Sequence, residues 1–161
     1  MSSRRNARER VMQALFAFEL GGGSPDSIAQ TIIRPGFEDD PASFSFADSL
    51  FRRTLEHRND AEEIIRRHTR NWELSRIALI DRIILRVAIC ELLTFEDIPP
   101  KVSINEAIEV AKKYSTSNSG KFVNGILDAA VAELVEEGTL HKTGRGLIGI
   151  ESISRNDEEP L

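Results

Sequence analysis

The chain has few of the sequence features that indicate disulfides, metal clusters or insertion into a membrane. Cys90 is the only cysteine among 161 residues, which excludes an internal disulfide and a metal cluster built on several thiolates. No apolar run approaches the roughly 20 residues of a membrane-spanning helix, and no apolar signal segment follows the first arginines. We therefore expect a cytoplasmic protein that does not enter a membrane.

Motifs for catalysis or cofactor binding are also missing. The glycine-rich phosphate loop GxxxxGK[ST] does not occur, and no His-Asp pair is adjacent in the sequence. His57 and His68 have no carboxylate near them at a metal-ligand spacing. The sequence thus predicts a protein with no enzymatic activity, no cofactor and no metal.

The hydrophobic content of the chain is sufficient for one buried core. The chain is 40% hydrophobic and 29% charged, with a formal net charge of -5, so we expect a single domain over residues 1–137. Residues 138–161 contain several glycines and the acidic run at 157–159 but no periodic pattern. They are predicted to form a flexible C-terminal tail.

Apolar residues recur at helical spacing rather than at alternate positions, which predicts an all-α fold, a compact antiparallel helical bundle. Residues 74–95 are apolar in nearly every direction around the axis, so this helix is expected in the middle of the bundle. The sequence SINE at 103–106 has capping-box spacing and predicts a helix start there. The expected helices cover residues 4–20, 46–58, 60–70, 74–95, 103 onward and 121–136. A less ordered stretch is expected between the first two, through Pro35, Gly36 and Pro41.

The first expected helix carries a basic cluster in an otherwise acidic chain. Arg4, Arg5, Arg8 and Arg10 stand against Glu9 alone within residues 1–10. Such a cluster favours contact with phosphates, which contributes affinity rather than sequence choice. A solvated or frayed N-terminus is the alternative interpretation.

Two large apolar residues lie outside the stripe of the same helix. Met12 and Phe16 project to the side away from Ala7, Val11 and Ala14. Paired apolar side chains on a polar face indicate a partner-binding patch. Burial under another element of the same chain is the alternative.

The stretch KFVNGILD at residues 121–128 places an aromatic ring where the last helix is expected to begin. Phe122 lies about 100° from the centre of that helix's apolar stripe, beside Lys121 and a loop rich in hydroxyl side chains. A ring for a base, with a lysine and a helix N-terminus for phosphates, is typical of single-stranded nucleic acid binding. The alternative is a phenylalanine at the edge of the core beside a solvated lysine.

Three further residues fall within the central helix. Cys90 is expected to pack there as a small hydrophobic residue. Arg82 and Arg86 stack one turn apart on one face and are expected to pair with acidic groups of a neighbouring helix.

Several motifs, in their order and spacing, resemble the NusB transcription antitermination family. The resemblance covers residues 4–18 and 72–131, and the last two motifs together are highly specific. The motifs are RRNARE at 4–9, QALF at 13–16, DRIILR at 81–86, EL at 91–92, KVSINEAIEVAK at 101–112 and KFVNGILD at 121–128.

This resemblance implies an all-helical domain of two small subdomains that binds boxA RNA of ribosomal RNA leaders together with NusE, a ribosomal small-subunit protein. The complex would join RNA polymerase and other Nus factors so that transcription passes terminators. Phe16 and Asp81 would face NusE, and the patch described above adds Met12 to that surface. The residues expected to contact RNA are Arg4, Arg5, Arg8, Tyr114, Ser119, Lys121 and Phe122.

Three alternatives remain open. The chain resembles the helical N-terminal domain of some RNA cytosine methyltransferases, but such an enzyme would need a further Rossmann-like domain with a glycine-rich cofactor loop, for which we expect this chain to be too short. A helical protein-interaction module without an RNA role is the second. The third concerns assembly: free subunits would form a homodimer through the arginine-rich helix and hide the RNA surface.

Overall fold

The computed structural model describes residues 3–69 and 77–153, and every regular element in these two ranges is helical. The predicted all-α fold is therefore confirmed. The main helices are α1 (Ser3–Gly21), α2 (Pro25–Ile28), α3 (Pro41–Glu56), α4 (Arg58–Arg67), α5 (Leu79–Thr94), α6 (Pro100–Tyr114) and α7 (Ser117–Glu136). Shorter turns are the π-helix η1 (Ala29–Ile33) and the 3₁₀ helices η2 (Arg34–Gly36) and η4 (Gly144–Leu147).

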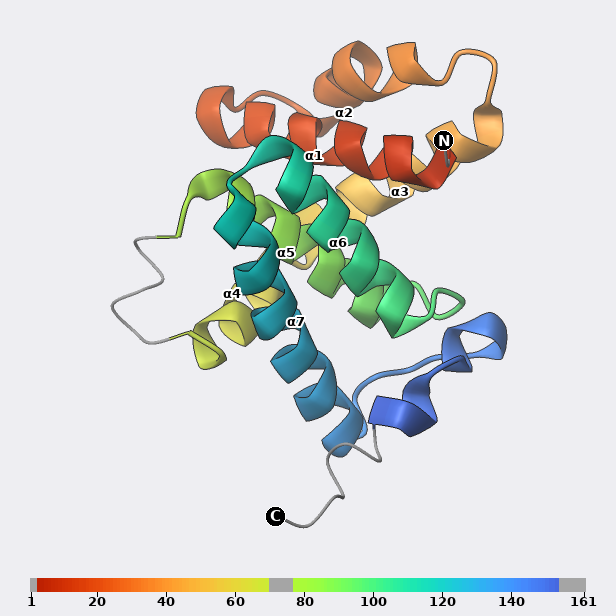
Figure 1. The fold of residues 1–161 in the computed structure, drawn as a ribbon. Coiled ribbons are helices and arrows are strands. Elements are labelled where there is room, and N and C mark those ends of the chain that lie inside the picture. Colours follow the sequence, from red (N-terminus) through yellow and green to blue (C-terminus); the bar gives the residue numbers. More distant parts are fainter. Residues whose placement is uncertain (1–2, 70–76, 154–161) are drawn as a thin grey trace.

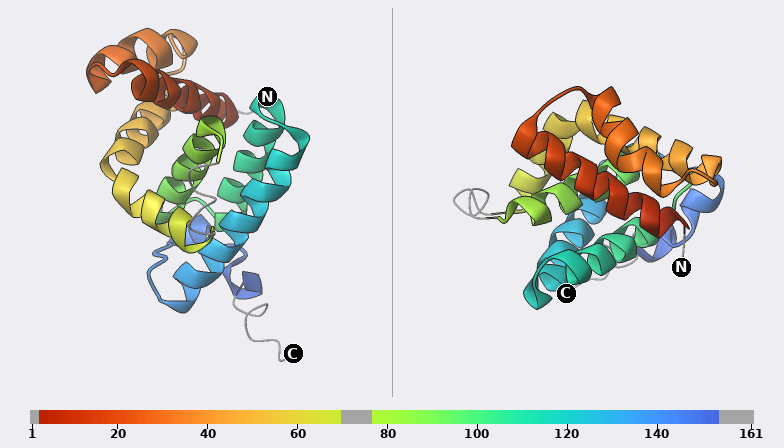
Figure 2. Two further views of the ribbon diagram at one scale, coloured as in Figure 1. Left: turned by 90° about the vertical axis from the view of Figure 1, so that its left-hand side faces the viewer. Right: turned by 90° about the horizontal axis from the view of Figure 1, so that it is seen from above.

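Helix α5 occupies the middle of the bundle, as its apolar sequence predicts. It packs against α1 and α3 on one side and against α4, α6 and α7 on the other (Figure 1). Helix α1 lies across the top of the molecule, with the segment before α3 along one flank and α6 along the other (Figure 2). The two groups of helices share α5 and one continuous hydrophobic core.

Helix starts differ from the sequence predictions by up to five residues, since α3 begins at Pro41 rather than at residue 46. The break between α3 and α4 falls at His57 rather than at residues 59–60. Helix α6 begins at Pro100, because proline is well suited to the first helical position, where its missing N–H is not needed. Ser103 is consequently an interior residue and not a cap. The start of α5 expected at residue 74 lies outside the described residues, and the described helix begins at Leu79.

The segment between α1 and α3 is more ordered than its glycines and prolines suggested. Gly22 and Gly23 end α1 with φ values of 66° and 100°, a backbone region that side chains disfavour. Ser24 then caps α2 by accepting a hydrogen bond from the Ser27 amide, and Pro25 takes the first helical position. The chain continues through η1 and η2 to α3, so the expectation of a less ordered stretch was wrong.

Residues 139–153, named here the C-terminal strap, turn back after α7 and pack onto the corner between α5 and α6. The Lys142 ammonium is buried and donates to the backbone oxygens of Glu91 and Phe95, at 3.3 and 2.7 Å. The Thr143 amide donates to the oxygen of Glu96 at 2.9 Å. The expectation of a flexible tail therefore needs correction as far as Ile153, while residues 154–161 lie outside the described ranges.

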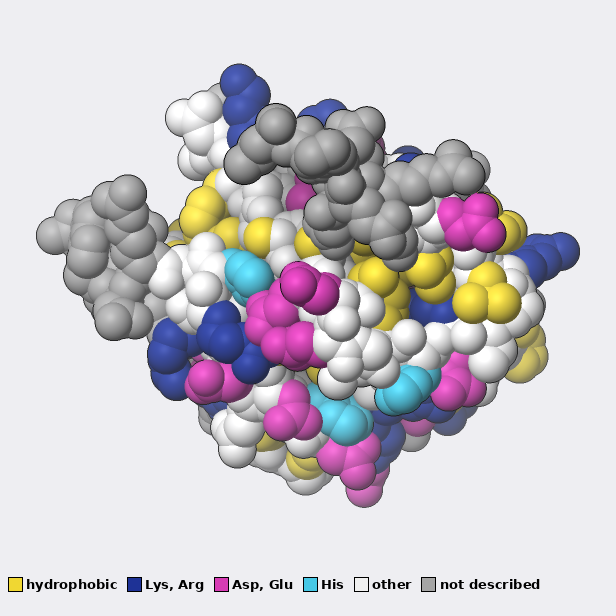
Figure 3. Space-filling view, turned by 90° about the horizontal axis from the view of Figure 1, so that it is seen from below, with side chains coloured by type: hydrophobic (Ala, Val, Ile, Leu, Met, Phe, Trp, Pro, Cys, Tyr) yellow, Lys and Arg dark blue, Asp and Glu magenta, His cyan; other side chains and the backbone are white. Residues whose placement is uncertain are grey.

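The face that carries the strap has a mixed surface. Seen from below, acidic, basic, histidine and hydrophobic side chains are interspersed on it (Figure 3). In residues 3–69 and 77–153, no helix is both long and apolar enough to cross a membrane.

The buried amine of Lys142 predicts a pH dependence of stability. Burial lowers its pKa from 10.5 to about 8, although the carboxylates of Glu91, Asp97 and Glu96 act in the opposite direction. Between these pH values the unfolded chain binds more protons than the folded chain, so the free energy of unfolding should rise with pH. Below about pH 8 both states are protonated, and this contribution should become constant.

Urea unfolding at a series of pH values from 7 to 10.5 checks this expectation, with Lys142→Met as the test variant. The variant should lose the rise, whereas Lys112→Met, which removes an exposed lysine, should keep it. Identical pH profiles for the wild type and Lys142→Met would contradict the assignment.

Candidate RNA and partner interface

The three arginines expected at the RNA surface have three different environments. Arg4 is exposed, and its guanidinium lies 4.6 Å from the centre of the Phe46 ring. Arg5 is 40% exposed and pairs with Glu106 of α6 at 2.8 Å. Arg8 is only 5% exposed, so the expectation that it contacts phosphate needs correction. Only the first two present charge at the surface.

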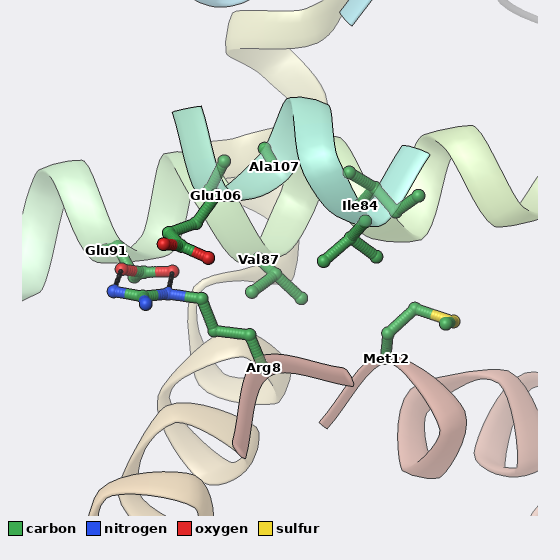
Figure 4. Close-up of a pocket in the computed structure, with 9 residues that line it drawn as sticks. Arg8, Met12, Ile84, Val87, Glu91, Glu106 and Ala107 are labelled. Carbon is green, nitrogen blue, oxygen red and sulfur yellow. Dashed lines mark hydrogen bonds and ion pairs between the residues drawn. The ribbon is translucent and has the colours of Figure 1, made fainter. Parts of the chain in front are cut away.

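Arg8 instead forms a buried, two-pronged ion pair with Glu91 of α5. Its Nε and Nη2 atoms donate to the two carboxylate oxygens at 2.9 and 2.7 Å (Figure 4). Burial opposes the charge of Arg8, but the hydrogen bonds and charge of Glu91 outweigh it and raise the pKa of Arg8. Ser103 donates a further hydrogen bond to Glu91 at 3.2 Å. One carboxylate thus connects α1, α5 and α6.

Met12 lies on the same inner face and not on a partner surface. It is 3% exposed and lines a cavity of about 20 Å³ with Ile84 and Val87 of α5 (Figure 4). A volume of this size holds about one water molecule. The prediction that Met12 is exposed in a partner-binding patch is therefore wrong. Other helices cover α1 on two sides, so α1 buries a wider face than its apolar stripe. Phe16 is half-buried and packs against the core.

Asp81, Ser119 and Phe122 come together in one pocket, although they were assigned to two different surfaces. The hydroxyl pocket, as we name it, has a volume of about 450 Å³. It is lined by Ile77, Ala78, Asp81, Ser115, Thr116, Ser119 and Phe122. Asp81 is 7% exposed and lies in the first turn of α5, so it does not form an open partner surface.

Hydrogen bonds in the hydroxyl pocket have a defined direction. Ser119 Oγ donates to Asp81 Oδ2 at 3.0 Å. Because this uses the only hydroxyl hydrogen of Ser119, the hydroxyls of Ser115 and Thr116 must donate to Ser119, at 2.8 and 3.0 Å. Among the described residues, Asp81 Oδ1 is buried without a hydrogen-bond partner. Asp81, which lines the pocket beside the Phe122 ring, therefore has one carboxylate oxygen that no protein group uses.

Lys121 and Phe122 lie in the second turn of α7, because this helix begins at Ser117 and not at Lys121. Lys121 is exposed and Phe122 is half-buried, which agrees with a position on the flank of the helix. The free amides of the first turn lie one turn earlier than expected, next to the serine and threonine side chains. The ring is thus an edge residue of the core that also lines the hydroxyl pocket.

A polar hollow of about 350 Å³ lies between α1 and the end of α6. Tyr114 lines it, and the tyrosine hydroxyl accepts a hydrogen bond from Gln13 at 3.4 Å. Asn6 and Arg10 line it from α1. Residue type gave no signal for Gln13, since a glutamine on a helix surface is usually solvated. The hollow adds polar groups that sequence reasoning did not single out.

The paired arginines of α5 are structural, as predicted. Arg82 and Arg86 both donate to Glu62 of α4, at 3.1 and 2.6 Å, and Arg86 also donates to Glu19 of α1. Burial alone would raise the pKa of Glu62, but these hydrogen bonds lower it on balance. Cys90 is buried within α5, and burial raises the pKa of its thiol. No cluster of three or more metal-ligating side chains occurs in the described ranges.

The structure is an all-helical domain in which Arg4, Tyr114 and Phe122 lie near the ends of α1, α6 and α7. The model of the NusB family matches residues 5–132. The chain is 52% identical over 153 residues to the transcription antitermination protein NusB of Salinibacter ruber, covering 95% of this chain and 96% of the relative. It is 46% identical over 148 residues to NusB of Chloroherpeton thalassium, covering 92% and 70% of the two chains. The protein belongs to the NusB family.

Solved structures agree with this assignment. NusB of T. maritima is 39% identical and superposes with a TM-score of 0.73, covering 81% of this chain and 91% of that chain. A chain in a crystal structure of the antitermination factors NusB and NusE in complex with double-stranded RNA is 25% identical. Its TM-score is 0.72, and the match covers 81% of this chain and 96% of that chain.

Breaking the buried pair should destabilise the fold strongly. Arg8→Ala leaves the Glu91 carboxylate buried without its partner and should lower the free energy of unfolding by about 3–5 kcal/mol. Arg52→Ala is the matched control, since that arginine is 42% exposed and its surface ion pairs are worth about 0–1 kcal/mol. Urea unfolding followed by circular dichroism measures both. A loss below about 1 kcal/mol for Arg8→Ala would show that the pair is not the buried contact described.

Proposed function

We propose that this protein is a transcription antitermination factor that binds boxA-type RNA of ribosomal RNA leaders together with the ribosomal protein NusE. In this role it is a non-catalytic adaptor in the cytoplasm that joins the RNA to RNA polymerase and other Nus factors. Membership in the NusB family supports the proposal, as do the names of the relatives. The observation that carries it is the placement of Phe122 beside the hydrogen-bonding groups of the hydroxyl pocket.

The hydroxyl pocket suits an unstacked RNA base. The Phe122 ring offers a stacking surface, and Asp81, Ser115 and Thr116 offer hydrogen-bonding atoms for a base edge. Lys121 is exposed on the same turn of α7 and supplies a positive charge for the backbone. Single-stranded RNA is read in this way, by stacking combined with hydrogen bonds to base edges.

Phosphate contacts are proposed for Arg4 and Arg5 at the other end of the surface. Arg4 is exposed. The ion pair between Arg5 and Glu106 is partly solvated, so little free energy is lost when an RNA phosphate replaces Glu106 as the partner of Arg5. Tyr114 and the polar hollow lie on the α1 and α6 side between the two ends. Arg8 contributes indirectly, by holding the helix that carries Arg4 and Arg5.

The proposed NusE contact uses Phe16. Met12 lies one turn earlier on the same face of α1 and supports Phe16 from within the core. Asp81 would act from the hydroxyl pocket rather than from an open surface. Because Asp81 lines the hydroxyl pocket, the proposed protein contact would share this residue with the proposed base contact, which is consistent with joint binding of RNA and NusE.

A protein-interaction module without an RNA role is the second candidate. It is favoured by the pairing of Arg5 and Arg8 with glutamates, which reduces the positive charge available for RNA. The two functions are distinguished by whether RNA binding depends on sequence.

RNA binding should be specific for boxA and should depend on NusE. In fluorescence anisotropy, boxA RNA should bind more tightly than a scrambled RNA, and NusE should strengthen binding. Three to five phosphate contacts on a single strand give a slope of log affinity against log salt of about -2 to -4. Equal affinity for both RNAs, or no binding with NusE present, would instead support the protein-interaction module.

Phe122→Ala should weaken boxA binding about 5- to 150-fold, because stacking of one base on an aromatic ring is worth about 1–3 kcal/mol. Arg4→Ala should make the salt slope shallower by about 0.7, since one phosphate contact is lost. Arg66→Ala on α4 removes a similarly exposed arginine and is the matched control; it should change neither quantity. The same anisotropy titrations measure all three variants.

Phe16→Asp should abolish NusE binding while the circular dichroism spectrum is retained, because a carboxylate would be forced into an apolar contact. Phe16→Ala, which adds no charge, should weaken binding less. Leu20→Asp places the same charge at a position that is 67% exposed on the same helix and serves as control. Isothermal titration with NusE measures each affinity, and unchanged binding by Phe16→Asp would remove Phe16 from the partner surface.

A further inference from the structure

The C-terminal strap follows the residues matched by the family model, which end at 132, yet it contacts the part of α5 that holds α1. The Lys142 ammonium lies at the C-terminal end of α5 and adds a second hydrogen bond to each of two backbone oxygens. Glu91 O also accepts from the Phe95 amide at 3.1 Å, and Phe95 O accepts from the Ile98 amide at 3.3 Å. A cation at this position is favourable for the helix dipole and caps the last carbonyl groups. The strap therefore fixes the last turn of α5.

One connection runs from the strap to the inner side of α1. Lys142 donates to the backbone oxygen of Glu91, and the carboxylate of the same residue holds Arg8 through two hydrogen bonds. Arg8 follows Arg4 by one helical turn and is therefore on the same side of α1. A shift of the α5 backbone at Glu91 would be passed directly to this turn of α1.

A second connection runs through aromatic rings. Lys142 donates to the backbone oxygen of Phe95, whose ring packs edge-on against Phe46 with 5.4 Å between the ring centres. Phe46 in turn stacks against the guanidinium groups of Arg4 and Arg8, at 4.6 and 5.4 Å. Lys142 is thus connected to the arginines of α1 by two routes that use different side chains.

We propose that the C-terminal strap is a positioning element for the RNA-binding end of α1, with Lys142 as the residue through which it acts. The proposal rests on the proposed function for its effect on RNA, although the mechanical connection between the strap and α1 can be tested without RNA. The strap would increase RNA affinity by holding Arg4 and Arg5 in place, which lowers the cost of ordering them on binding.

The strap can be displaced at two separate points. Lys142→Ala removes both hydrogen bonds to α5. Gly146→Ala acts by steric exclusion, since a Cβ atom at this residue would lie 1.9 Å from the backbone oxygen of Glu96. Arg145→Ala is the matched control, because it removes an exposed positive charge from the same strap.

The experiment measures amide hydrogen exchange of the full-length chain without RNA, followed by anisotropy with boxA RNA and calorimetry with NusE. Lys142→Ala and Gly146→Ala should both accelerate exchange in residues 5–12 while exchange in α4 stays unchanged. Their RNA affinity should fall about two- to thirtyfold, the range expected when a mutation alters the coupling between two sites, with unchanged affinity for NusE. Arg145→Ala should behave like the wild type.

Three results would overturn the proposal. Exchange in residues 5–12 that stays at the wild-type rate in both variants would show that the strap does not hold α1. Faster exchange in all helices would show a general loss of stability. Loss of RNA affinity with unchanged exchange would mean that the strap touches RNA itself. A fourth result would separate the two proposals. If the wild type binds no RNA but both variants exchange faster in residues 5–12, the proposed function is wrong, whereas the connection between the strap and α1 is supported.

Discussion

The buried ion pair between Arg8 and Glu91 is the interaction on which the arrangement of α1 depends. Removing two charges from water is costly, and the pair is tolerable because both prongs of the guanidinium are hydrogen-bonded and Ser103 satisfies the carboxylate further. Its geometry also fixes how α1 lies against α5 and α6, because a two-pronged contact admits little rotation. Of the three arginines expected to contact RNA, one therefore organises the core and two remain at the surface.

The two arginines that remain at the surface, Arg4 and Arg5, form one end of the proposed RNA surface. Arg4 rests on Phe46 and Arg5 is tied to Glu106, so both enter binding from restricted positions. At the other end, serine and threonine hydroxyls orient Asp81 beside the ring of Phe122. Charge at one end and shape with hydrogen bonds at the other correspond to affinity and selectivity, the two requirements of RNA recognition.

Periodicity was sufficient to predict that the six longer helices of the described ranges exist, that α5 is central and that Phe122 lies on a flank, because these follow from local spacing. It did not predict α2, η1 and η2. It could not identify the partner of Arg8, since Glu91 is 83 residues away and an arginine in a basic run is normally solvated. Asp81 and Ser119 are 38 residues apart and meet only in the folded chain. The strap was missed because its main anchor is a single buried lysine, and a lone lysine has no periodic signature.

In the proposed complex, one RNA molecule lies across the ends of α1 and α7. Photo-crosslinking of thiouridine-substituted boxA RNA in the presence of NusE, followed by mass spectrometry of the peptides, tests this arrangement most directly. We predict cross-links at two places, the peptide with Arg4 and Arg5 and the peptide with Lys121 and Phe122, and their loss on competition with unlabelled boxA. Cross-links confined to α3 or α4, or equally frequent with scrambled RNA, would contradict this placement.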